Sequence, residues 1–550
     1  MSIVLGIDTG GTFTDGVIYD NSQNTVLTKA KTPTVHADLS ESVSAVLDAL
    51  DFDEPEAIDK IVLSTTLATN AIVEGKGRSV GLIAIGAEPK DPLPTPWVKS
   101  VAGKIGIKGK ELMPLDEDAA EKAIEALMPH AEAFAVSGMM STRNNSHELA
   151  VKAMIENKTT APVICAHALS GQLGFHDRTV TAVLNAGLIP IIHDFITAVI
   201  RALDAKKITA PVFIVKGDGH LATLDFIKEK PVETILSGPA ASMIGAVTLS
   251  GADNAIVADM GGTTTDTGIV TNRSLTLSPV GAKVGRWQTH VDSAKLTTTG
   301  LGGDSAIVLD NGKPVLTPAR VIPACRQADA EAAPVLTPTD ILHLSGELSR
   351  WDTKKAKKAL DAQAEACGSD PKTLLSDLKN LVYRRIDEDV LKAYADLTYP
   401  VLAIGAPAGS WYHNLRDRTG RDAIIPEHHE VAAAVGAAVA AVEERATALV
   451  RPDEENDGFV AHIMGETASF SDKDTAVAFA ADAAKARVTA LAEAQGVGTP
   501  TVSVDIQTIE NRTSWKTEYI KTVIHAVARA ASVQSVREES KSYDYHLTGN

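Results

Sequence analysis

The sequence predicts an α/β protein built around two copies of one glycine-rich hairpin. Short apolar runs alternate with segments of helical periodicity along most of the 550 residues, and this alternation is typical of α/β domains. The octets Asp8–Asp15 (DTGGTFTD) and Asp259–Asp266 (DMGGTTTD) are identical at six of eight positions. Each octet follows one apolar strand and precedes another, so the motif and its structural context are duplicated together.

Composition and charge narrow the possible classes of protein. Hydrophobic residues make up 44% of the chain and charged residues 22%, as expected of a soluble globular protein with about three or four domains. The net charge of −18 disfavours nucleic acid as a partner. The short basic run 354–358 is interpreted as a solvated helix face.

Cysteine usage and the N-terminus bear on the cellular compartment. Cys165, Cys325 and Cys367 form no C-x-x-C pair, so each is interpreted as a buried thiol. For Cys325, which lies in a proline-rich loop, another role is left open. The N-terminus lacks the basic and long apolar segments of a signal peptide. The apolar stretch 431–442 is too short to cross a bilayer. We therefore expect a cytoplasmic protein with no membrane partner.

Strands and helices are expected to alternate along the chain, and they suggest three domains: 1–190, 191–450 and a small C-terminal α/β domain, 451–550. Strands are expected at 3–7, 16–19, 61–64, 80–85, 133–136, 163–166, 212–215, 255–258, 267–270, 402–404, 459–463 and 501–506. Helices are expected at 39–50, 116–127, 147–157, 177–203 (broken at Pro190), within 231–246, at 370–389, within 426–449 and at 472–495, with 520–531 helical or mixed.

The two octets have the chemistry of a phosphate and metal site. Paired glycines let backbone N–H groups approach an anion with no Cβ in the way, and threonine hydroxyls add donors. Aspartate repels phosphate but can hold Mg²⁺, which offsets the phosphate charge. Two such loops facing each other could clamp the triphosphate of ATP. The proposed phosphate contacts are Gly10, Gly11, Thr12 and Thr14, together with Gly261, Gly262, Thr263 and Thr264.

The octets differ from the common phosphate-binding motifs and from simple turns. The sequence contains no G-x-x-x-x-G-K-[ST] loop, and each octet opens a hairpin rather than the helix of a Rossmann fingerprint. A pair of acidic hairpin turns without any ligand would need neither the second glycine nor the threonine series. A nucleotide site is therefore favoured.

The hairpins resemble the two phosphate loops of the actin, sugar-kinase and heat-shock chaperone ATPase superfamily. The sequence around the hairpins resembles that of one branch of this superfamily, the hydantoinase/oxoprolinase family, over most of residues 1 to about 445. The matching segments are Asp8–Asp15, Thr65–Ala71 and Glu74–Gly77 for its N-terminal domain, and Thr179–Ala186, Ile235–Ala241 and Asp259–Asp266 for its hydantoinase A domain.

The resemblance implies duplicated actin-like (ribonuclease H-like) ATPase domains flanking a nucleotide cleft, and roles for the matched residues. Asp8 and Asp259 would organise Mg²⁺. Asp15 or Asp266 would orient a nucleophile or contact the groups that bind the metal. Further nucleotide contacts would come from Gly302 and Gly303 in one loop and from Gly405 and Ala406 in an adenosine loop, and 430–441 would be a connecting helix. Residues 86–94 and 299–305 depart from the family pattern, and the C-terminal region is shorter than in longer members.

The function implied by the resemblance is an ATP-dependent hydrolase that opens a cyclic amide of the hydantoin or 5-oxoproline type through phosphoryl activation of the amide. One alternative is a nucleotide-switched ATPase, or an ATP-using subunit of a multi-subunit hydrolase or carboxylase with a hydantoinase B-like companion. The third is a small-molecule kinase, for which Asp218 is the only indication.

Three further constellations each have two interpretations. The pair of histidines within Glu427–Glu430 could bind a metal, but adjacent side chains diverge at a helix start, which favours surface or capping roles. His220 lies in a loop after a strand, where α/β proteins place sites, or it is a turn residue. The segment His176–Arg178 precedes a helix, and capping is the simpler role. No Ser/His/Asp triad can be identified from spacing.

Overall fold

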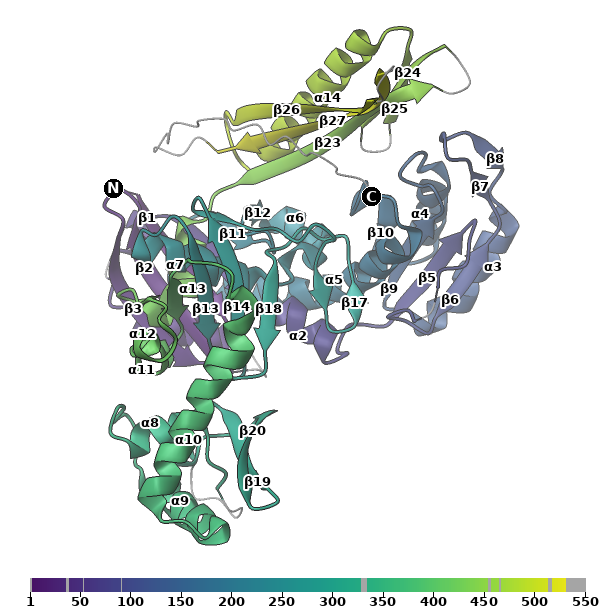
Figure 1. Cartoon of the computed structure of the whole chain (residues 1–550). Helices are drawn as coiled ribbons and strands as arrows, with labels where there is room; N and C mark the ends of the chain where they lie inside the picture. The colour runs from purple at the N-terminus through teal and green to yellow at the C-terminus, as the bar shows by residue number, and fades with distance from the viewer. Residues whose placement is uncertain are drawn as a thin grey trace. The chain divides into compact units, whose positions relative to one another are not determined.

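A computed structural model of the chain describes residues 2–35, 39–52, 54–90, 92–327, 334–453, 457–463, 466–512 and 517–530 (Figure 1). The chain divides into two compact units. The first comprises Met1–Ala440 with Met464–Thr467, and the second comprises Ala441–Ile463 with Ala468–Asn550. Each unit is described by itself.

The first unit opens with a six-stranded sheet of order β12-β11-β4-β1-β2-β3. β1, β2 and β3 form an antiparallel meander, whereas β1, β4 and β11 run parallel. The carboxyl ends of the parallel strands therefore share one edge, and α1 and α5 bury one face. The bounds are β1 (Ile3–Thr9), β2 (Phe13–Asp20), β3 (Thr25–Pro33), α1 (Leu39–Ala49), β4 (Ile58–Thr65), α2 (Leu67–Val73), α5 (Phe175–Ala205), β11 (Val212–Val215) and β12 (Leu221–Thr223).

A smaller, parallel sheet of order β10-β9-β5-β6 lies between β4 and α5 in the sequence. Helices α3 and α4 pack on one face, and the first half of α5 packs on the other. The bounds are β5 (Val80–Ile85), β6 (Val98–Val101), β7 (Lys104–Ile105), β8 (Glu111–Met113), α3 (Glu117–Leu127), β9 (Ala133–Gly138), α4 (Ser146–Lys158) and β10 (Val163–Cys165).

The long helix α5 is continuous, so the prediction of a break at Pro190 is wrong. Proline removes one backbone hydrogen bond and crowds the preceding turn. Here Leu188 and Ile192 are buried on either side of Pro190, and their packing holds the helix together. The predicted domain boundary at residue 190 falls inside α5, and the first sheet takes β11 and β12 from beyond it.

The second half of this unit repeats the meander and the parallel neighbour. β13 pairs antiparallel with β14 and parallel with β21, as β1 pairs with β2 and β4. The sheet order is β15-β14-β13-β21-β22, with β18 also paired to β14. The bounds are β13 (Ala255–Met260), β14 (Thr265–Thr271), β15 (Ser274–Leu275), β16 (Lys283–Val284), β17 (Trp287–Gln288), β18 (Leu296–Thr299), β21 (Val401–Ile404) and β22 (Ala423–Ile424).

An insertion between β18 and β21 forms its own cluster of elements, visible in Figure 1 as the green helices beside β19 and β20. Its apolar side chains share a core with the second sheet and with Trp411. The sequence predicted only its last helix. The bounds are β19 (Ser305–Asp310), β20 (Lys313–Arg320), α8 (Pro338–Leu344), α9 (Lys354–Cys367) and α10 (Pro371–Arg385), the last followed by a π-turn at Ile386–Val390.

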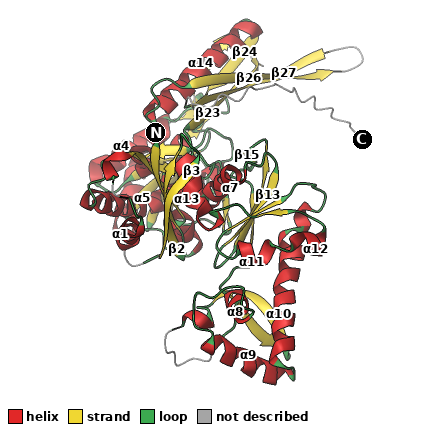
Figure 2. Cartoon of the chain, turned by 90° about the vertical axis from the view of Figure 1, so that its left-hand side faces the viewer, coloured by secondary structure: helices red, strands yellow, loops and turns green. Residues whose placement is uncertain are grey.

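Two helices rich in small residues lie side by side between the two large sheets, α7 (Ser237–Ser250) and α13 (Ala432–Val439) (Figure 2). Their backbones touch at two glycines: a Cβ on Gly245 would lie 1.9 Å from the Ala432 carbonyl oxygen, and one on Gly436 would lie 1.8 Å from that of Ala241. A duplicated sheet with a helix on each half is the predicted actin-like (ribonuclease H-like) architecture, and this prediction is confirmed.

The second unit is a five-stranded sheet of order β25-β24-β23-β27-β26 covered by α14, with a core made largely of alanine. The alanine-rich helix predicted within 426–449 is present as α13 but ends at Val439, and Glu443–Asp453 is a strand. The prediction of a helical or mixed segment at 520–531 is wrong, because residues 520–529 lie in a strand. The bounds are β23 (Glu443–Asp453), β24 (Gly458–Ile463), β25 (Glu466–Phe470), α14 (Lys473–Ala494), β26 (Thr501–Arg512) and β27 (Thr517–Arg529).

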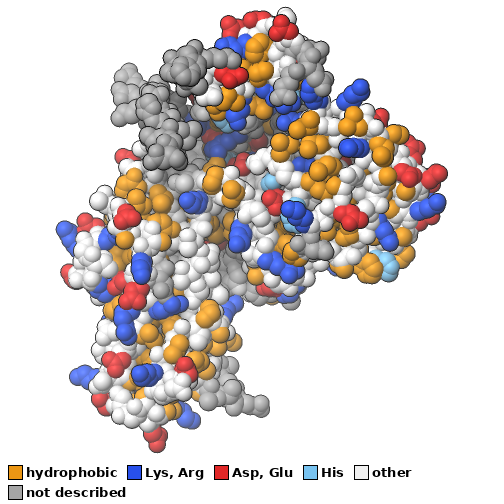
Figure 3. All heavy atoms as spheres, turned by 45° about the vertical axis from the view of Figure 1, so that its right-hand side comes forward, with side chains coloured by type: hydrophobic (Ala, Val, Ile, Leu, Met, Phe, Trp, Pro, Cys, Tyr) orange, Lys and Arg blue, Asp and Glu red, His pale blue; other side chains and the backbone are white. Residues whose placement is uncertain are grey.

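One described helix, α5, is long and apolar enough to cross a membrane by length and composition. It is a core helix here, because its two halves pack against β9 and α1. On the face drawn in Figure 3, basic and acidic side chains are interspersed among hydrophobic ones, and no broad basic field is visible.

Candidate functional site

The two octets form hairpins of the same geometry. In the first, Asp8 lies opposite Asp15 and the Gly10 N–H donates to the Phe13 carbonyl oxygen at 3.0 Å. In the second, Asp259 lies opposite Asp266, and the Gly261 N–H donates to the Thr264 carbonyl oxygen at 2.9 Å. The duplication seen in the sequence is therefore a duplication of turn, register and paired carboxylates.

Both hairpins open into one cavity of about 700 Å³. Loops from both halves meet there: a Cβ on Gly262 would lie 3.4 Å from Thr12 Oγ1 and 3.1 Å from Asp304 Oδ2. Fourteen of the predicted site residues line the cavity: Asp8, Gly10, Gly11, Thr12, Asp15, Asp259, Gly261, Gly262, Thr263, Thr264, Asp266, Gly303, Gly405 and Ala406.

Two predicted contacts lie outside this lining. Thr14 is fully buried and its hydroxyl bonds that of Thr34 at 3.1 Å. Gly302 packs against the backbone of the second octet, because a Cβ there would lie 2.4 Å from the Gly262 carbonyl oxygen. The neighbouring Asp304, which the sequence pattern did not single out, lines the cavity and donates its backbone N–H to the Gly262 carbonyl oxygen at 2.6 Å.

Glycine is required in the loop after β21. Gly405 has φ +89°, and a Cβ there would lie 2.2 Å from the Met260 carbonyl oxygen and 2.9 Å from Asp259 Oδ1. The loop thus sits directly on the end of β13 and beside its carboxylate. His429 Nδ1 donates to the Gly405 carbonyl oxygen at 2.9 Å and also lines the cavity.

Helix N-termini add partial positive charge to the same cavity. Gly238, Pro239 and Ser242, from the first turns of α7, line it. Thr66, the N-cap residue of α2, does so as well. Free N–H groups and the helix dipole at such ends favour anions, so the site offers phosphate-like ligands backbone donors beyond those of the two hairpins.

Burial disfavours the charged form of the four hairpin aspartates, Asp8, Asp15, Asp259 and Asp266. Burial raises the pKa of Asp8 to about 7 against the opposing hydrogen bond from Ser64, whose Oγ donates to Asp8 Oδ1 at 2.5 Å. Burial raises the pKa of Asp266 to about 6, and it raises the pKa of Asp15 and of Asp259 as well. Several buried carboxylates in one cavity are the donor set that a hard divalent cation prefers.

The cations of the cavity were not predicted from the sequence. Lys31 Nζ donates to both carboxylate oxygens of Asp15 at 2.7 Å, from the register position directly opposite it on β3. The alternation of residues 25–33 could have revealed this pair, but β3 was not predicted. Arg320 and Arg326 line the cavity and approach Asp304 Oδ2 to 3.6 and 3.9 Å.

Arg326 also links the two halves. Its guanidinium lies 5.4 Å from the ring centroid of Phe13, in the first octet, and 5.2 Å from that of Trp351, in the insertion. Contacts of this kind hold a cation in place without neutralising it. No local sequence pattern marks Arg326, because its partners come from segments far apart in the chain.

The other candidate histidines lie in structural settings. His428 Nδ1 accepts from Lys29 Nζ at 2.9 Å. His220 Nδ1 lies 3.2 Å from Asp218 Oδ2, with Lys216 Nζ at 3.6 Å from the same oxygen. Burial alone would raise the pKa of Asp218, but Lys216 and His220 lower it. Arg178 is buried and donates to the Gly138 and Gln172 carbonyl oxygens.

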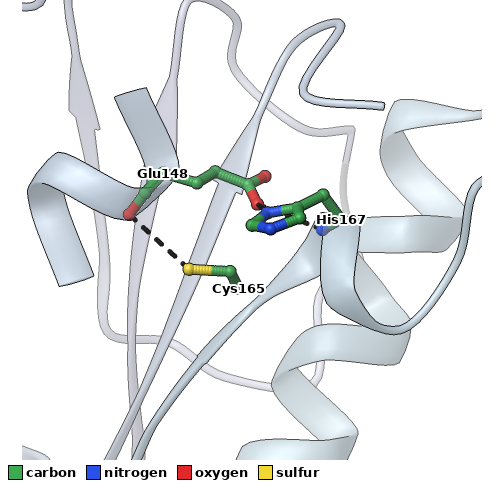
Figure 4. Close-up of side chains that lie close together, drawn as sticks. All are labelled: Glu148, Cys165 and His167. Atoms are coloured by element: carbon green, nitrogen blue, oxygen red, sulfur yellow. Dashed lines mark hydrogen bonds and ion pairs between the residues drawn. The ribbon is translucent and has the colours of Figure 1, made fainter. Parts of the chain in front are cut away.

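A second cluster, Glu148, Cys165 and His167, brings three metal-ligand types together (Figure 4). Its hydrogen bonds are already satisfied: Glu148 accepts from the Gly138 N–H at 2.6 Å and from His167 Nδ1 at 2.5 Å. Burial, with Glu148 nearby, raises the pKa of Cys165 to about 12, so the thiol stays protonated. We interpret the cluster as a structural network. Cys165 and Cys325 are buried, as predicted, and Cys367 is partly buried.

The fold places this chain in the actin-like class, with two copies of one hairpin meeting at one cavity. Comparison with known proteins narrows the class. Residues 178–446 match the hydantoinase/oxoprolinase family model, and residues 4–159 match the model of the hydantoinase/oxoprolinase N-terminal region. The chain belongs to the hydantoinase/oxoprolinase family.

Relatives are found by sequence and by structure. The chain is 30% identical to caprolactamase subunit alpha of Pseudomonas jessenii and 28% identical to the acetophenone carboxylase gamma subunit of Aromatoleum aromaticum; each match covers 56% of this chain. The matches cover 49% and 47% of those proteins, so the chain spans about half the length of these curated relatives.

Two solved structures share the fold over nearly the whole chain. The ATP-dependent caprolactamase of Pseudomonas jessenii aligns with a TM-score of 0.73 at 22% identity, covering 98% of this chain and 90% of that one. A nucleotide-free acetone carboxylase aligns with a TM-score of 0.74 at 17% identity, covering 96% and 88%.

Proposed function

We propose that the protein uses ATP with Mg²⁺ to open a cyclic amide, transferring the terminal phosphoryl group to the amide oxygen before water opens the ring. The observation that carries the proposal is the pair of hairpins with matched carboxylates, Asp8 opposite Asp15 and Asp259 opposite Asp266, lining one cavity. The relatives support it: one is named a caprolactamase, and its solved structure is described as ATP-dependent.

The cavity fits the proposed ligands. A Mg²⁺ ion held by Asp8 and Asp259 would neutralise phosphate charge there. The glycines of both hairpins carry no Cβ that would keep an anion away from the backbone, and the N-terminus of α7 adds donors. The hairpin and helix residues would position the phosphates. Asp15 is tied to Lys31, so Asp266 is the better placed of the two to orient a nucleophile.

The amide chemistry needs phosphoryl transfer because an unactivated amide is a poor electrophile. Transfer to the amide oxygen breaks the bond between the β- and γ-phosphates and releases ADP. One water then adds to the activated carbon, the ring C–N bond breaks as the nitrogen takes a proton, and a second water releases phosphate from the resulting acyl phosphate. The test is ATP turnover by the purified chain with hydantoin, 5-oxoproline or caprolactam present. Stimulation by none of them, alone or with a companion chain, would contradict the proposal.

The alternative of an ATP-using subunit is favoured by one observation: two relatives are named as subunits, alpha and gamma, of larger enzymes. We propose that a hydantoinase B-like chain is the companion. Co-expression with such a chain from the same genome, followed by gel filtration, should give a stable complex in which amide-dependent ATP turnover appears or rises. Separate elution with unchanged turnover would contradict this.

The kinase alternative loses support, because Asp218 is ion-paired outside the cavity lining.

Stability without metal should fall as the pH rises. The folded-state pKa values of about 7 for Asp8 and about 6 for Asp266 lie above the unfolded value near 4. Their stabilising contribution is therefore fully present below pH ~4 and lost as the pH rises through about 6 to 7. Added Mg²⁺ should raise Tm little at pH 5 and clearly at pH 8. Thermal scans with EDTA or MgCl₂ measure this, and equal Mg²⁺ effects at both pH values would contradict it.

Arg326 should contribute to nucleotide binding. A triphosphate exceeds the charge of one Mg²⁺. Lys31 is closely paired with Asp15 at 2.7 Å, whereas Arg326 approaches Asp304 only to 3.9 Å and is held in the cavity by two aromatic rings. We expect Arg326→Gln to lower kcat/KM for ATP by about tenfold or more, chiefly through KM. Arg416→Gln, which removes an exposed surface ion pair, is the matched control. A ratio unchanged in both variants would remove Arg326 from the site.

A further inference from the structure

A second cavity of about 900 Å³ lies in the first unit. Four segments build it: the end of α2 with the following loop (71–78), the proline-rich loop 92–96, one face of α5 (183–188) and the turn between β16 and β17 (285–287). Most of its lining side chains are aliphatic, proline or tryptophan. Its size is in the range of small-molecule sites, which are mostly apolar with a few polar groups that set orientation.

This cavity borders the cavity into which the two hairpins open, called the phosphate cavity below. Glu74 lines both. Helix α2 joins them, because Asn70 at its middle lines the phosphate cavity and Ala71 to Val73 line the second one. Seven helical residues span only ~10 Å. The two cavities are therefore neighbours along one short helix.

The charged groups of the second cavity are mainly basic. The Arg286 guanidinium lies 4.4 Å from the ring centroid of Trp287, and it forms no ion pair with the described part of the chain. Arg78 has only loose partners, Glu132 at 3.6 Å and Asp194 at 4.0 Å, all partly exposed. A guanidinium stacked on an indole keeps its outer N–H groups available for a carboxylate.

We propose that the second cavity binds a small organic anion, an apolar ring bearing one carboxylate, with the carboxylate on Arg286 and the ring on the apolar wall beside Trp287 and Leu184. Glu74, at the border with the phosphate cavity, disfavours a second negative group on that side. If this molecule is also the cyclic amide that accepts the phosphoryl group, that role rests on the proposed function; the binding site itself does not.

The experiment measures binding of cyclohexanecarboxylate and of the neutral cyclohexanecarboxamide to the full chain by calorimetry or ligand-observed NMR, without nucleotide. We expect the carboxylate to bind about tenfold more tightly than the amide. Arg286→Gln should abolish this preference, and Arg286→Lys should retain part of it. Lys283→Gln is the matched control, because it removes an exposed cation from the same hairpin outside the cavity lining.

Three outcomes would overturn the proposal: no detectable binding of either probe, equal binding of acid and amide, or equal effects of Arg286→Gln and Lys283→Gln. Asp259→Asn separates this proposal from the proposed function. It should leave carboxylate binding unchanged while ATP turnover is lost. If instead wild type binds the carboxylate but never turns over ATP, the proposed function fails and the second site stands.

Discussion

Asp259→Asn is expected to reduce Mg²⁺-dependent ATP turnover by at least about a hundredfold. The substitution keeps the shape of the side chain and removes the charge that would hold the metal. Asp259 lies at the end of β13, beside Gly405 and opposite Asp266, and the metal would lose one of the two carboxylates proposed to hold it. Asp8→Asn should have a similar effect through the first hairpin.

The same substitution should stabilise the protein in the absence of metal. Burial raises the pKa of Asp259, which means that its charged form is disfavoured in the fold, and an amide avoids that penalty. A higher Tm in EDTA together with lost turnover would separate this outcome from misfolding. Asp361→Asn, on an exposed face of α9, is the matched control and should change neither quantity. Unchanged turnover in Asp259→Asn would refute the metal assignment.

Gly436→Ala is expected to destabilise the first unit by more than about 3 kcal/mol. The added Cβ would lie 1.8 Å from the Ala241 carbonyl oxygen and 2.8 Å from the Gly245 nitrogen. Both are backbone atoms of a buried helix, so neither can rotate away. α13 also presses on β1, where a Cβ on Gly6 would lie 2.2 Å from the Ala434 carbonyl oxygen. Helix α13 is therefore in close contact with α7 on one side and with β1 on another, and a shift away from α7 would bring it into β1.

Chemical unfolding measures this effect, with Gly498→Ala as the control. Nothing lies within 4 Å of a Cβ at Gly498, and its backbone is not left-handed, so alanine there should be neutral or slightly stabilising. Gly245→Ala should match Gly436→Ala, because both substitutions separate the same pair of helices. An unfolding midpoint of Gly436→Ala near that of wild type would show that the helices can move apart.

The strongest parts of the sequence prediction were those with local causes. The octets could be found because a glycine-rich turn between two apolar strands is set by neighbouring residues. The predicted helix starts at residues 116 and 472 coincide with the N-cap residues of α3 and α14, Asp116 and Asp472. Errors arose where tertiary contacts decide. Ala446 and Ala448 face a core from β23, yet alanine has a helical preference, and the prediction followed it.

The site was predicted only as far as its repeated loops. The cations that complete the cavity come from elsewhere: Lys31 from an unpredicted strand, Arg320 and Arg326 from an insertion whose strands were not recognised. Asp304 was passed over in favour of the adjacent glycines. Each owes its place to pairing between segments far apart in the chain, which spacing within one segment does not encode.

The course of α5 has a consequence for engineering the protein. One helix of 31 residues, ~45 Å long, lends its first half to the small sheet and the second cavity and its second half to the sheet that carries Asp8. The two regions are therefore not separable modules. Substitutions at residues 183–188 that change which ligand the second cavity binds are expected to shift α5, and with it the sheet that carries the first hairpin. Variants from such a library should therefore be screened for ATP turnover as well as for ligand binding.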